Sequence, residues 1–403
     1  MNAANMSLKP KKSYRWAMLF MAWMTYFCFG LICFSIAPLI TDIMLELNLT
    51  YTQIGAIGSA WPLSFMIASY PEGVIIDRFG IKKSITFGIF FISLSSALRA
   101  LGQNFYSLIL PTAIFGFGAP MISLGLPKLV ATWFSGRERG TASGLYYTGV
   151  SSGTAFSLGA TNSIILPLVG TWRNCFLLYG LIGFTVMLIW IRFAKNIPNK
   201  HTTTSKNEKT WKKITELLKY RNVWLIVVIG LSTFFTIHSL NNWLPKILEA
   251  KELTLTLAGF LAAIFNIFRI IGGLFIPRMA YSLGSRRLSA SLMLLTIGLS
   301  IIAIGKATGS LLIFGIIAVG ICLGSLTPVL LTLLMDAPEV GPNRMGAAGG
   351  LYFSFGEVGG ILGPFMIGFL KDMTGLFIPG LIVLSIIAIC MMIFSAFIRE
   401  VKI

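Results

Sequence analysis

The amino-acid sequence predicts an all-α protein that crosses a membrane many times. Of its 403 residues, 56% are hydrophobic and only 11% are charged, whereas a soluble domain carries roughly 25% charged residues. Apolar runs close to the ~20 residues that a helix needs to cross a bilayer fill nearly the whole chain. The alternating segments of about ten residues that mark a membrane β-barrel do not occur in this sequence. We therefore expect a polytopic bundle of membrane helices.

The apolar runs form two sets of six, which predicts twelve transmembrane helices in two pseudo-symmetric bundles. The expected spans of the first half are 16–40, 51–76, 84–102, 106–133, 141–167 and 174–193. Those of the second half are 222–247, 255–280, 287–305, 310–335, 346–370 and 376–398. The only long polar stretch lies between the two sets. We therefore expect one bundle over residues 1–193, a linker over 194–221 and a second bundle over 222–403.

The positions of Lys and Arg predict the orientation. Cytoplasmic loops carry an excess of these residues. One face collects most of the cations, including Lys9, Lys11, Lys12, Arg15, Arg78, Lys82, Lys83, Arg137, Arg139, Arg278, Arg286, Arg287, Arg344, Arg399 and Lys402. Both termini and the linker are therefore expected in the cytoplasm, with the protein in the cell (inner) membrane.

The composition also argues against several other classes of partner. The net charge of +18 is explained by the cationic turns on one face, so no nucleic-acid partner is expected. The five cysteines lie inside apolar runs and the chain has two histidines, so no metal site and no cofactor are expected. A nucleotide-binding loop of the form G-x-x-x-x-G-K-S/T is absent from the sequence, which argues against ATP as the driving force.

A short charged motif interrupts the apolar pattern over residues 73–83 and returns in weaker form over 273–287. The first copy contains Gly73, Asp77, Arg78, Gly80, Lys82 and Lys83, and the second contains Arg278, Arg286 and Arg287. Asp77 ends the second span where the eleventh is expected to begin, and a carboxylate at a helix N-terminus gains about 0.3–1 kcal/mol from the helix dipole. We interpret these residues as a cytoplasmic gate. The alternative is that the cations only anchor the topology.

The first copy resembles the loop signature G-x-x-x-D-R-x-G-x-K/R-K/R of the major facilitator superfamily. The second copy departs from it, because Pro277 replaces the Asp and extra residues precede Gly284. The resemblance covers the whole chain. It implies two six-helix bundles that rock around a central site and expose it to each side in turn, in a protein that works as a monomer in the lipid bilayer.

Charged residues inside the spans are candidates for the substrate site. Arg269 lies midway along the eighth span, and Asn266 precedes it by three residues on the same helix face. Arg keeps its charge, so a carboxylate or other anion is its natural ligand. Its position resembles that of the anion-binding arginine in the oxalate/formate, nitrate/nitrite and cyanate branches of the superfamily. The alternative is a structural ion pair with Glu357.

Glu357 lies midway along the eleventh span, where burial would favour proton uptake. We interpret it as the proton-coupling candidate, or as a ligand for the ammonium group of an amino acid. The oxalate type is expected to carry a lysine in this span, so Glu357 makes oxalate itself doubtful. Further candidates for the cavity are Tyr26, Tyr147, His238, Asn241, Trp243 and Tyr352. The run 241–245 is expected to break the seventh helix at a gate, and Arg99 is expected to anchor the third span at the outer interface.

Together these features predict an alternating-access secondary transporter of a small carboxylate-bearing metabolite, an organic anion or amino acid, driven by proton coupling or exchange. The alternative is an exporter of amphiphilic drugs or organic cations. Loss of anion transport in Arg269→Ala would favour the first, and survival of drug export would favour the second. A non-transporting receptor on the same scaffold is disfavoured, because the gate motif serves a moving protein. No enzyme is expected, since no nucleophile, base and orienting group can be grouped.

Overall fold

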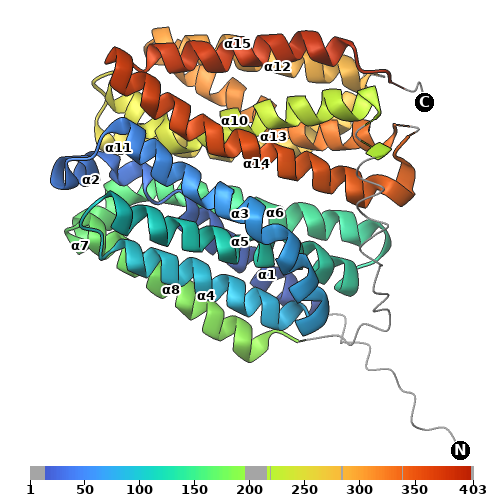
Figure 1. Cartoon of the computed structure of the whole chain (residues 1–403), viewed down its shortest axis with the longest axis horizontal. Coiled ribbons are helices and arrows are strands. Elements are labelled where there is room, and N and C mark those ends of the chain that lie inside the picture. Colours follow the sequence, from blue (N-terminus) through green and yellow to red (C-terminus); the bar gives the residue numbers. More distant parts are fainter. Residues whose placement is uncertain (1–13, 196–215, 218, 283–284, 338, 401–403) are drawn as a thin grey trace, which may run out of the picture.

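The computed structural model describes residues 14–195, 216–217, 219–282, 285–337 and 339–400. Within these ranges the protein is built from helices, twelve of which have 19 residues or more (Figure 1). The first six are α1 (Tyr14–Cys33), α3 (Tyr51–Phe79), α4 (Ile81–Arg99), α5 (Phe105–Trp133), α6 (Gly136–Ala160) and α8 (Trp172–Phe193). The second six are α10 (Arg221–Glu249), α11 (Leu255–Ser282), α12 (Arg286–Lys306), α13 (Gly309–Met335), α14 (Gly341–Thr374) and α15 (Ile378–Ala396). The all-helical polytopic fold expected from the sequence is confirmed.

Two of the long helices lack a continuous apolar stretch of the kind that the other spans contain. Ten helical segments of the described chain are long and apolar enough to cross a membrane, with Tyr14–Leu47 as one of them. The other two long helices are α3 and α6, whose sequences are rich in Gly, Ser and Thr. They pack against α14 and α11 of the other half (Figure 1). These helices therefore turn one face to protein instead of lipid, which explains the lack of such a stretch.

The first span is broken near one end. After Cys33 the chain turns, passes through the 3₁₀ segment η1 (Ala37–Leu39) and enters a short helix, α2 (Ile40–Leu47). Between α6 and α8 lie a π-helical segment, η2 (Thr161–Ile165), and the short helix α7 (Leu166–Val169). The expected break in the seventh span is wrong, because α10 continues through 241–245 to Glu249. A proline is tolerated in a membrane helix when neighbouring groups satisfy the backbone that it frees.

Local signals set several helix ends. Thr50 and Asn104 form capping boxes at the starts of α3 and α5, each with a side chain that accepts from the backbone three residues later. At the other end of α3, Gly80 has φ 84°, a conformation that residues with a side chain rarely adopt. This glycine lets the chain pass from α3 directly into α4.

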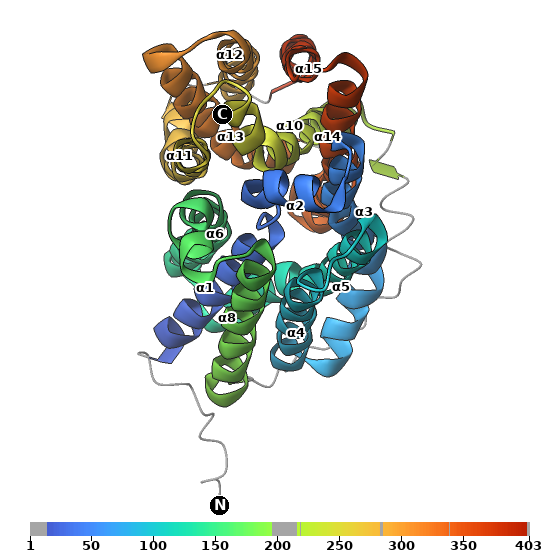
Figure 2. The same ribbon diagram turned by 90° about the vertical axis from the view of Figure 1, so that its left-hand side faces the viewer.

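In the described part of the chain, the closest contacts between the two halves lie at one end. We call the end at which α8 finishes and α10 begins the linker end, and the opposite end the sealed end. Hydrogen bonds between described residues of the two halves lie at the sealed end. In the first half they involve Thr41, Tyr51, Thr52 and Ser59. Figure 2 looks onto this end, where α2 lies between the halves.

Glycines on the facing helices show the same contrast. At the sealed end, a Cβ atom on Gly55 would lie 2.5 Å from the Pro364 carbonyl oxygen. A Cβ atom on Gly259 would likewise overlap the Leu158 carbonyl oxygen. At the linker end, Gly73, Gly140 and Gly350 have no such neighbour within 4 Å. Helices that approach this closely need small residues at the contact. The halves are thus in close contact at the sealed end, and their contacts become sparse toward the linker end, where a Cβ on Gly144 would still lie 3.7 Å from Leu274 of the other half.

Candidate functional site

A chain of amide groups holds Arg269 in the second half. Arg269 Nη1 donates to Asn266 Oδ1 at 2.9 Å, and Asn266 Nδ2 donates to Asn241 Oδ1 of α10, also at 2.9 Å. The two side chains, which the three-residue spacing places on one helix face, are therefore in contact. Arg269 Nε has no hydrogen-bond partner in the described part of the chain. No described carboxylate lies within ion-pair distance of Arg269, so the alternative pair with Glu357 does not form in this conformation.

Glu357 and His238 lie together beside this chain of amides. His238 Nε2 is 4.0 Å from Glu357 Oε2, and both side chains are almost fully buried. Neither Glu357 Oε2 nor His238 Nδ1 has a hydrogen-bond partner among the described residues. The backbone comes close here because Gly360 has no side chain; a Cβ at that position would lie 2.9 Å from His238 Nδ1. A buried carboxylate without full hydrogen bonding is costly when charged, which suits a group that takes up a proton or a ligand.

Aromatic rings of the first half face these polar groups. Trp61 of α3 stacks on the His238 ring at 5.1 Å, and Phe34 meets the same ring edge-on at 6.3 Å. Phe34 and Trp61 were not predicted from the sequence, because a single aromatic residue in an apolar run usually belongs to the core. Only the fold brings them to the boundary between the halves.

Tyrosines line the next part of the boundary. Tyr26 contacts the rings of Tyr146 and Tyr147 at 5.7 and 5.9 Å, and its hydroxyl lies 3.5 Å from Ser123. Tyr147 is 52% exposed, yet it interacts electrostatically with both Arg269 and Glu357 of the other half. It therefore faces a water-accessible space between the halves. Of the predicted residues, Tyr147 therefore lies near Arg269, and Tyr26 packs against Tyr147.

Two of the predicted site residues pack inside the second half. Tyr352 is fully buried, its ring is edge-on to Phe234, and its hydroxyl lies 3.5 Å from Thr327 Oγ1. Trp243 is also buried, and its ring nitrogen donates to the Pro364 carbonyl at 2.8 Å. The structure gives Trp243 a packing position at the sealed end, against the rings of Tyr51 and Phe377.

The predicted gate residues lie at the linker end. The Asp77 side chain falls outside the described residues. Arg78 is exposed beside the ring of Phe79, Lys83 and Arg278 are also exposed, and the Lys82 carbonyl accepts from Trp190 Nε1 at 3.1 Å. A gating role for these residues stays a prediction.

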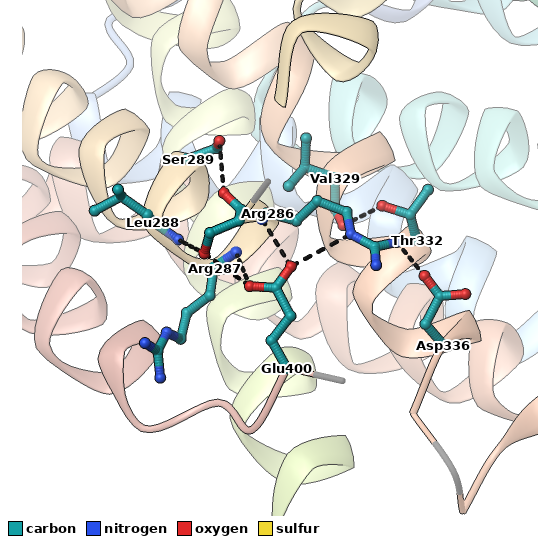
Figure 3. Close-up of polar contacts among 9 residues, drawn as sticks. Arg286, Arg287, Leu288, Ser289, Val329, Thr332, Asp336 and Glu400 are labelled. Atoms are coloured by element: carbon teal, nitrogen blue, oxygen red, sulfur yellow. Dashed lines mark hydrogen bonds and ion pairs between the residues drawn. The ribbon is translucent and has the colours of Figure 1, made fainter. Parts of the chain in front are cut away.

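Arg286 and Arg287 form a polar cluster within the second half (Figure 3). Glu400 accepts from the backbone N–H groups of Arg286 and Arg287 at 2.8 and 3.2 Å, and Arg286 also pairs with Asp336. Burial alone would raise the pKa of Glu400, but hydrogen bonds from Ser285 and the two arginines bring it below the ordinary value. This cluster ties the start of α12 to α13 and to the end of the chain.

The site combines a fixed guanidinium, a buried carboxylate with a histidine, and several tyrosine hydroxyls. Such a set can bind an anion with polar substituents and can hold a proton. In the described ranges, no three His, Cys, Asp or Glu side chains gather as metal ligands would. The groups that are present suit a small polar organic ligand between the two halves.

Comparisons with known proteins agree on one family. The family model described as Major Facilitator Superfamily matches residues 22–364. A hexuronate transporter of Bacillus subtilis is 27% identical over 85% of this chain and 83% of its own length. The probable galactarate/D-glucarate transporter GudP of Escherichia coli is 24% identical over 85% and 84%. The quinolone resistance protein NorA of Staphylococcus aureus is 26% identical over 84% and 85%.

The fold has a counterpart among solved structures. A bacterial homologue of the human lysosomal transporter Spinster, in an inward-facing and occupied conformation, superposes with a TM-score of 0.72. It is 16% identical and the match covers 96% of this chain and 97% of that one. The relatives named for anionic substrates handle sugar acids, so the expectation of an oxalate, nitrate or cyanate type is not specifically supported. The amino-acid alternative also finds no support in these names.

Proposed function

Because the chain belongs to the Major Facilitator Superfamily and is a multi-pass secondary transporter rather than an enzyme, we propose that it carries a small hydroxylated carboxylate of the sugar-acid class. Arg269 would bind the carboxylate and Glu357 would carry the coupling proton. The linker end would face the cytoplasm, as the distribution of Lys and Arg predicts.

The observation that carries this proposal is the incomplete hydrogen bonding of the Arg269 guanidinium. Its Nη1 is held by Asn266, while its Nε has no partner among the described residues. The guanidinium is half-buried and its Nε atom is shielded from solvent, so a ligand that supplies negative charge in part of the transport cycle would offset the cost of the unpaired cation. A carboxylate is the ligand whose geometry suits the guanidinium. Asn266 and Asn241 are neutral, so they orient the guanidinium and leave its charge uncompensated.

The tyrosines of the first half support a substrate that carries hydroxyl groups. Tyr147, near Arg269, and Tyr26 beside it offer phenol hydroxyls and ring faces. Hydroxyl groups of a substrate can exchange hydrogen bonds with these phenols while its carbon skeleton packs on the rings. The hexuronate and galactarate/D-glucarate relatives are consistent with such a substrate.

The position of Glu357 supports proton coupling. Its Oε2 faces His238 at 4.0 Å and has no hydrogen-bond donor in the described structure. The neutral carboxylic acid avoids the desolvation cost of a buried charge. Proton binding at Glu357 would therefore be linked to the conformations that bury it. In Glu357→Gln, we expect uphill uptake driven by a pH gradient to be lost while exchange of internal for external substrate persists.

The test is uptake into proteoliposomes of radiolabelled D-glucuronate and D-glucarate by wild type, Arg269→Ala and Arg269→Lys. We expect transport to fall at least about 100-fold in Arg269→Ala, because a charged hydrogen bond to a buried carboxylate contributes about 3 kcal/mol. Arg269→Lys should keep part of the activity, since it retains the charge. Arg192→Ala removes an exposed arginine outside the site and is the matched control. Full sugar-acid transport by Arg269→Ala would refute the proposal.

An exporter of amphiphilic drugs is the second candidate, and the match to NorA is what favours it. Aromatic rings such as Trp61 and Tyr147 are also suited to flat organic molecules. The same proteoliposomes decide between the two. Export of a fluoroquinolone that survives in Arg269→Ala but is lost in Glu357→Gln would replace the sugar-acid proposal with this one.

A further inference from the structure

Arg99 is a buried cation outside the substrate site. It is the last residue of α4 and its side chain is fully buried. This corrects the expectation that Arg99 anchors the third span at the membrane surface. No described carboxylate lies within ion-pair distance, and Nε and Nη2 have no hydrogen-bond partner among the described residues. A charge buried in this way is costly, so a structural role must offset the cost.

The described hydrogen-bond partners of Arg99 all belong to the break in the first span, while its guanidinium also lies over the Phe115 ring of α5 at 5.8 Å. Its Nη1 donates to the Ile32 carbonyl at 2.9 Å and lies 3.4 Å from Ser35 Oγ. The Ser35 hydroxyl also donates to the Ile32 carbonyl, at 2.8 Å. The last carbonyls of a helix lack partners and carry partial negative charge. Arg99 therefore caps α1 from another helix, at the point where the backbone leaves the helical path.

A second buried side chain holds the other end of this break. Asn162, in the π-helical segment η2, donates to the Pro38 carbonyl at 2.9 Å. A π-helical segment inserts an extra residue into the helix and often serves a local function. The turn over residues 34–39 is thus fixed from α4 on one side and from η2 on the other.

The chain beyond the break contacts the second half. Phe34 meets the His238 ring at 6.3 Å. Thr41 of α2 accepts from Lys246 Nζ at 2.7 Å and donates to Glu249 at 2.7 Å, both on α10. The direction in which the chain leaves Cys33 therefore determines where Phe34 and α2 meet α10.

We propose that Arg99 is a positioning residue for transport, which fixes the break in the first span and thereby places Phe34 and α2 against the second half at the sealed end. The guanidinium is suited to this task because it keeps its charge in an apolar interior and offers several donors at fixed angles. The role concerns the conformation of the protein, so it does not depend on which substrate is carried.

The experiment measures distances between spin labels in detergent-solubilised protein whose five native cysteines have been replaced. One label pair joins position 45 on α2 to position 311 at the start of α13, and a reference pair joins position 106 on α5 to position 311. Leu45, Tyr106 and Leu311 are all exposed, so labels there do not disturb the core. Both pairs are measured in wild type, Arg99→Met and Arg99→Lys.

In Arg99→Met, we expect the 45–311 distribution to broaden and shift to longer distances. The fraction at the wild-type distance should fall at least about tenfold relative to the new component, as loss of a buried charged hydrogen bond implies. The 106–311 pair should stay unchanged, because position 106 lies outside the broken span. Arg99→Lys should restore most of the wild-type distribution, since it keeps the charge and a donor.

Ser96→Ala is the matched control. Ser96 lies one turn earlier on α4, is buried and donates to the Phe176 carbonyl at 2.8 Å, without contact to the break. Wild-type distributions in a folded Arg99→Met protein would overturn the proposal, as would an equal shift in Ser96→Ala. If Arg99→Met does not fold, Arg99→Gln gives the same test, with a smaller shift expected and an unchanged 45–311 distribution as the contrary result.

Discussion

Asp372 caps a helix of the other half at the sealed end. It lies near the end of α14, and its carboxylate accepts from the Tyr51 and Thr52 backbone N–H groups at 3.1 and 2.7 Å and from the Thr52 hydroxyl at 2.5 Å. These donors form the N-terminus of α3, which carries partial positive charge. The contact joins the two halves, so it must break whenever the sealed end opens. Substituting Asp372 should therefore change the balance between the two conformations.

The size of the change follows from the contacts that are lost. Asp372→Asn keeps one oxygen acceptor but loses the charge, which is worth about 1 kcal/mol at an exposed helix N-terminus. Asp372→Ala loses all three hydrogen bonds, or about 2 kcal/mol after discounting for solvent. Since the contacts exist in the sealed conformation only, these energies appear directly in the equilibrium. The ratio of sealed to opened protein should fall about 5-fold in the first variant and about 30-fold in the second.

The assay is the distance between spin labels at positions 106 and 311, one in each half at the sealed end. Both variants should gain a population at longer distances, smaller in Asp372→Asn and larger in Asp372→Ala. The control Asp336→Asn should gain none, because the Asp336 carboxylate pairs with Arg286 inside one half. Acidic pH that protonates Asp372 should mimic Asp372→Asn. Identical distributions in wild type and Asp372→Ala would refute the view that this contact holds the end closed.

The contacts at the two ends support three further predictions. Gly259→Val should abolish transport without loss of protein from the membrane, because the new side chain would overlap the Leu158 carbonyl across the halves; Gly140→Ala, which faces open space, should transport normally. Asp77→Asn should greatly slow transport at unchanged protein amount if this residue closes the linker end, and uptake at the wild-type rate would exclude a gating role. Glu400→Gln should lower stability by roughly 1 kcal/mol at pH 7 through loss of charged hydrogen bonds. Because the folded pKa of Glu400 lies below its ordinary value of about 4.3, this difference should persist above that pH and vanish as the pH falls through the folded pKa. Thermal unfolding in detergent at several pH values measures it, and a difference that grows on acidification would contradict the assignment.

The sequence was sufficient for the fold class, and it singled out the residue on which the proposed site is centred. Twelve apolar runs and a repeated charged loop predict the membrane helices, because the bilayer leaves few alternatives for a spanning segment. Arg269 stood out because a charge at mid-membrane is rare, and its contact with Asn266 followed from helix periodicity. The proposed sugar-acid class could not be inferred from the sequence, since carboxylates of many kinds suit one arginine.

Other features depended on contacts between distant segments. The break in the first span is stabilised by Arg99 and Asn162, which lie on other helices, and only Pro38 marks it locally. The run 241–245 looked like a better break, yet α10 continues through it. Trp61 and Phe34 resemble core residues in the sequence, and only the packing of the halves brings them to His238.

The composition of α3 and α6 has a consequence for biosynthesis. These two helices lack the continuous apolar stretch of the other spans, and both pack against the second half. The translocon inserts a segment according to its own hydrophobicity, and it meets both helices before α11 and α14 have been made. Their insertion would therefore rely on neighbours such as α1 and α5. A first half expressed alone would expose two polar seams to lipid, so it should be degraded rapidly and be rescued by co-expression of the second half.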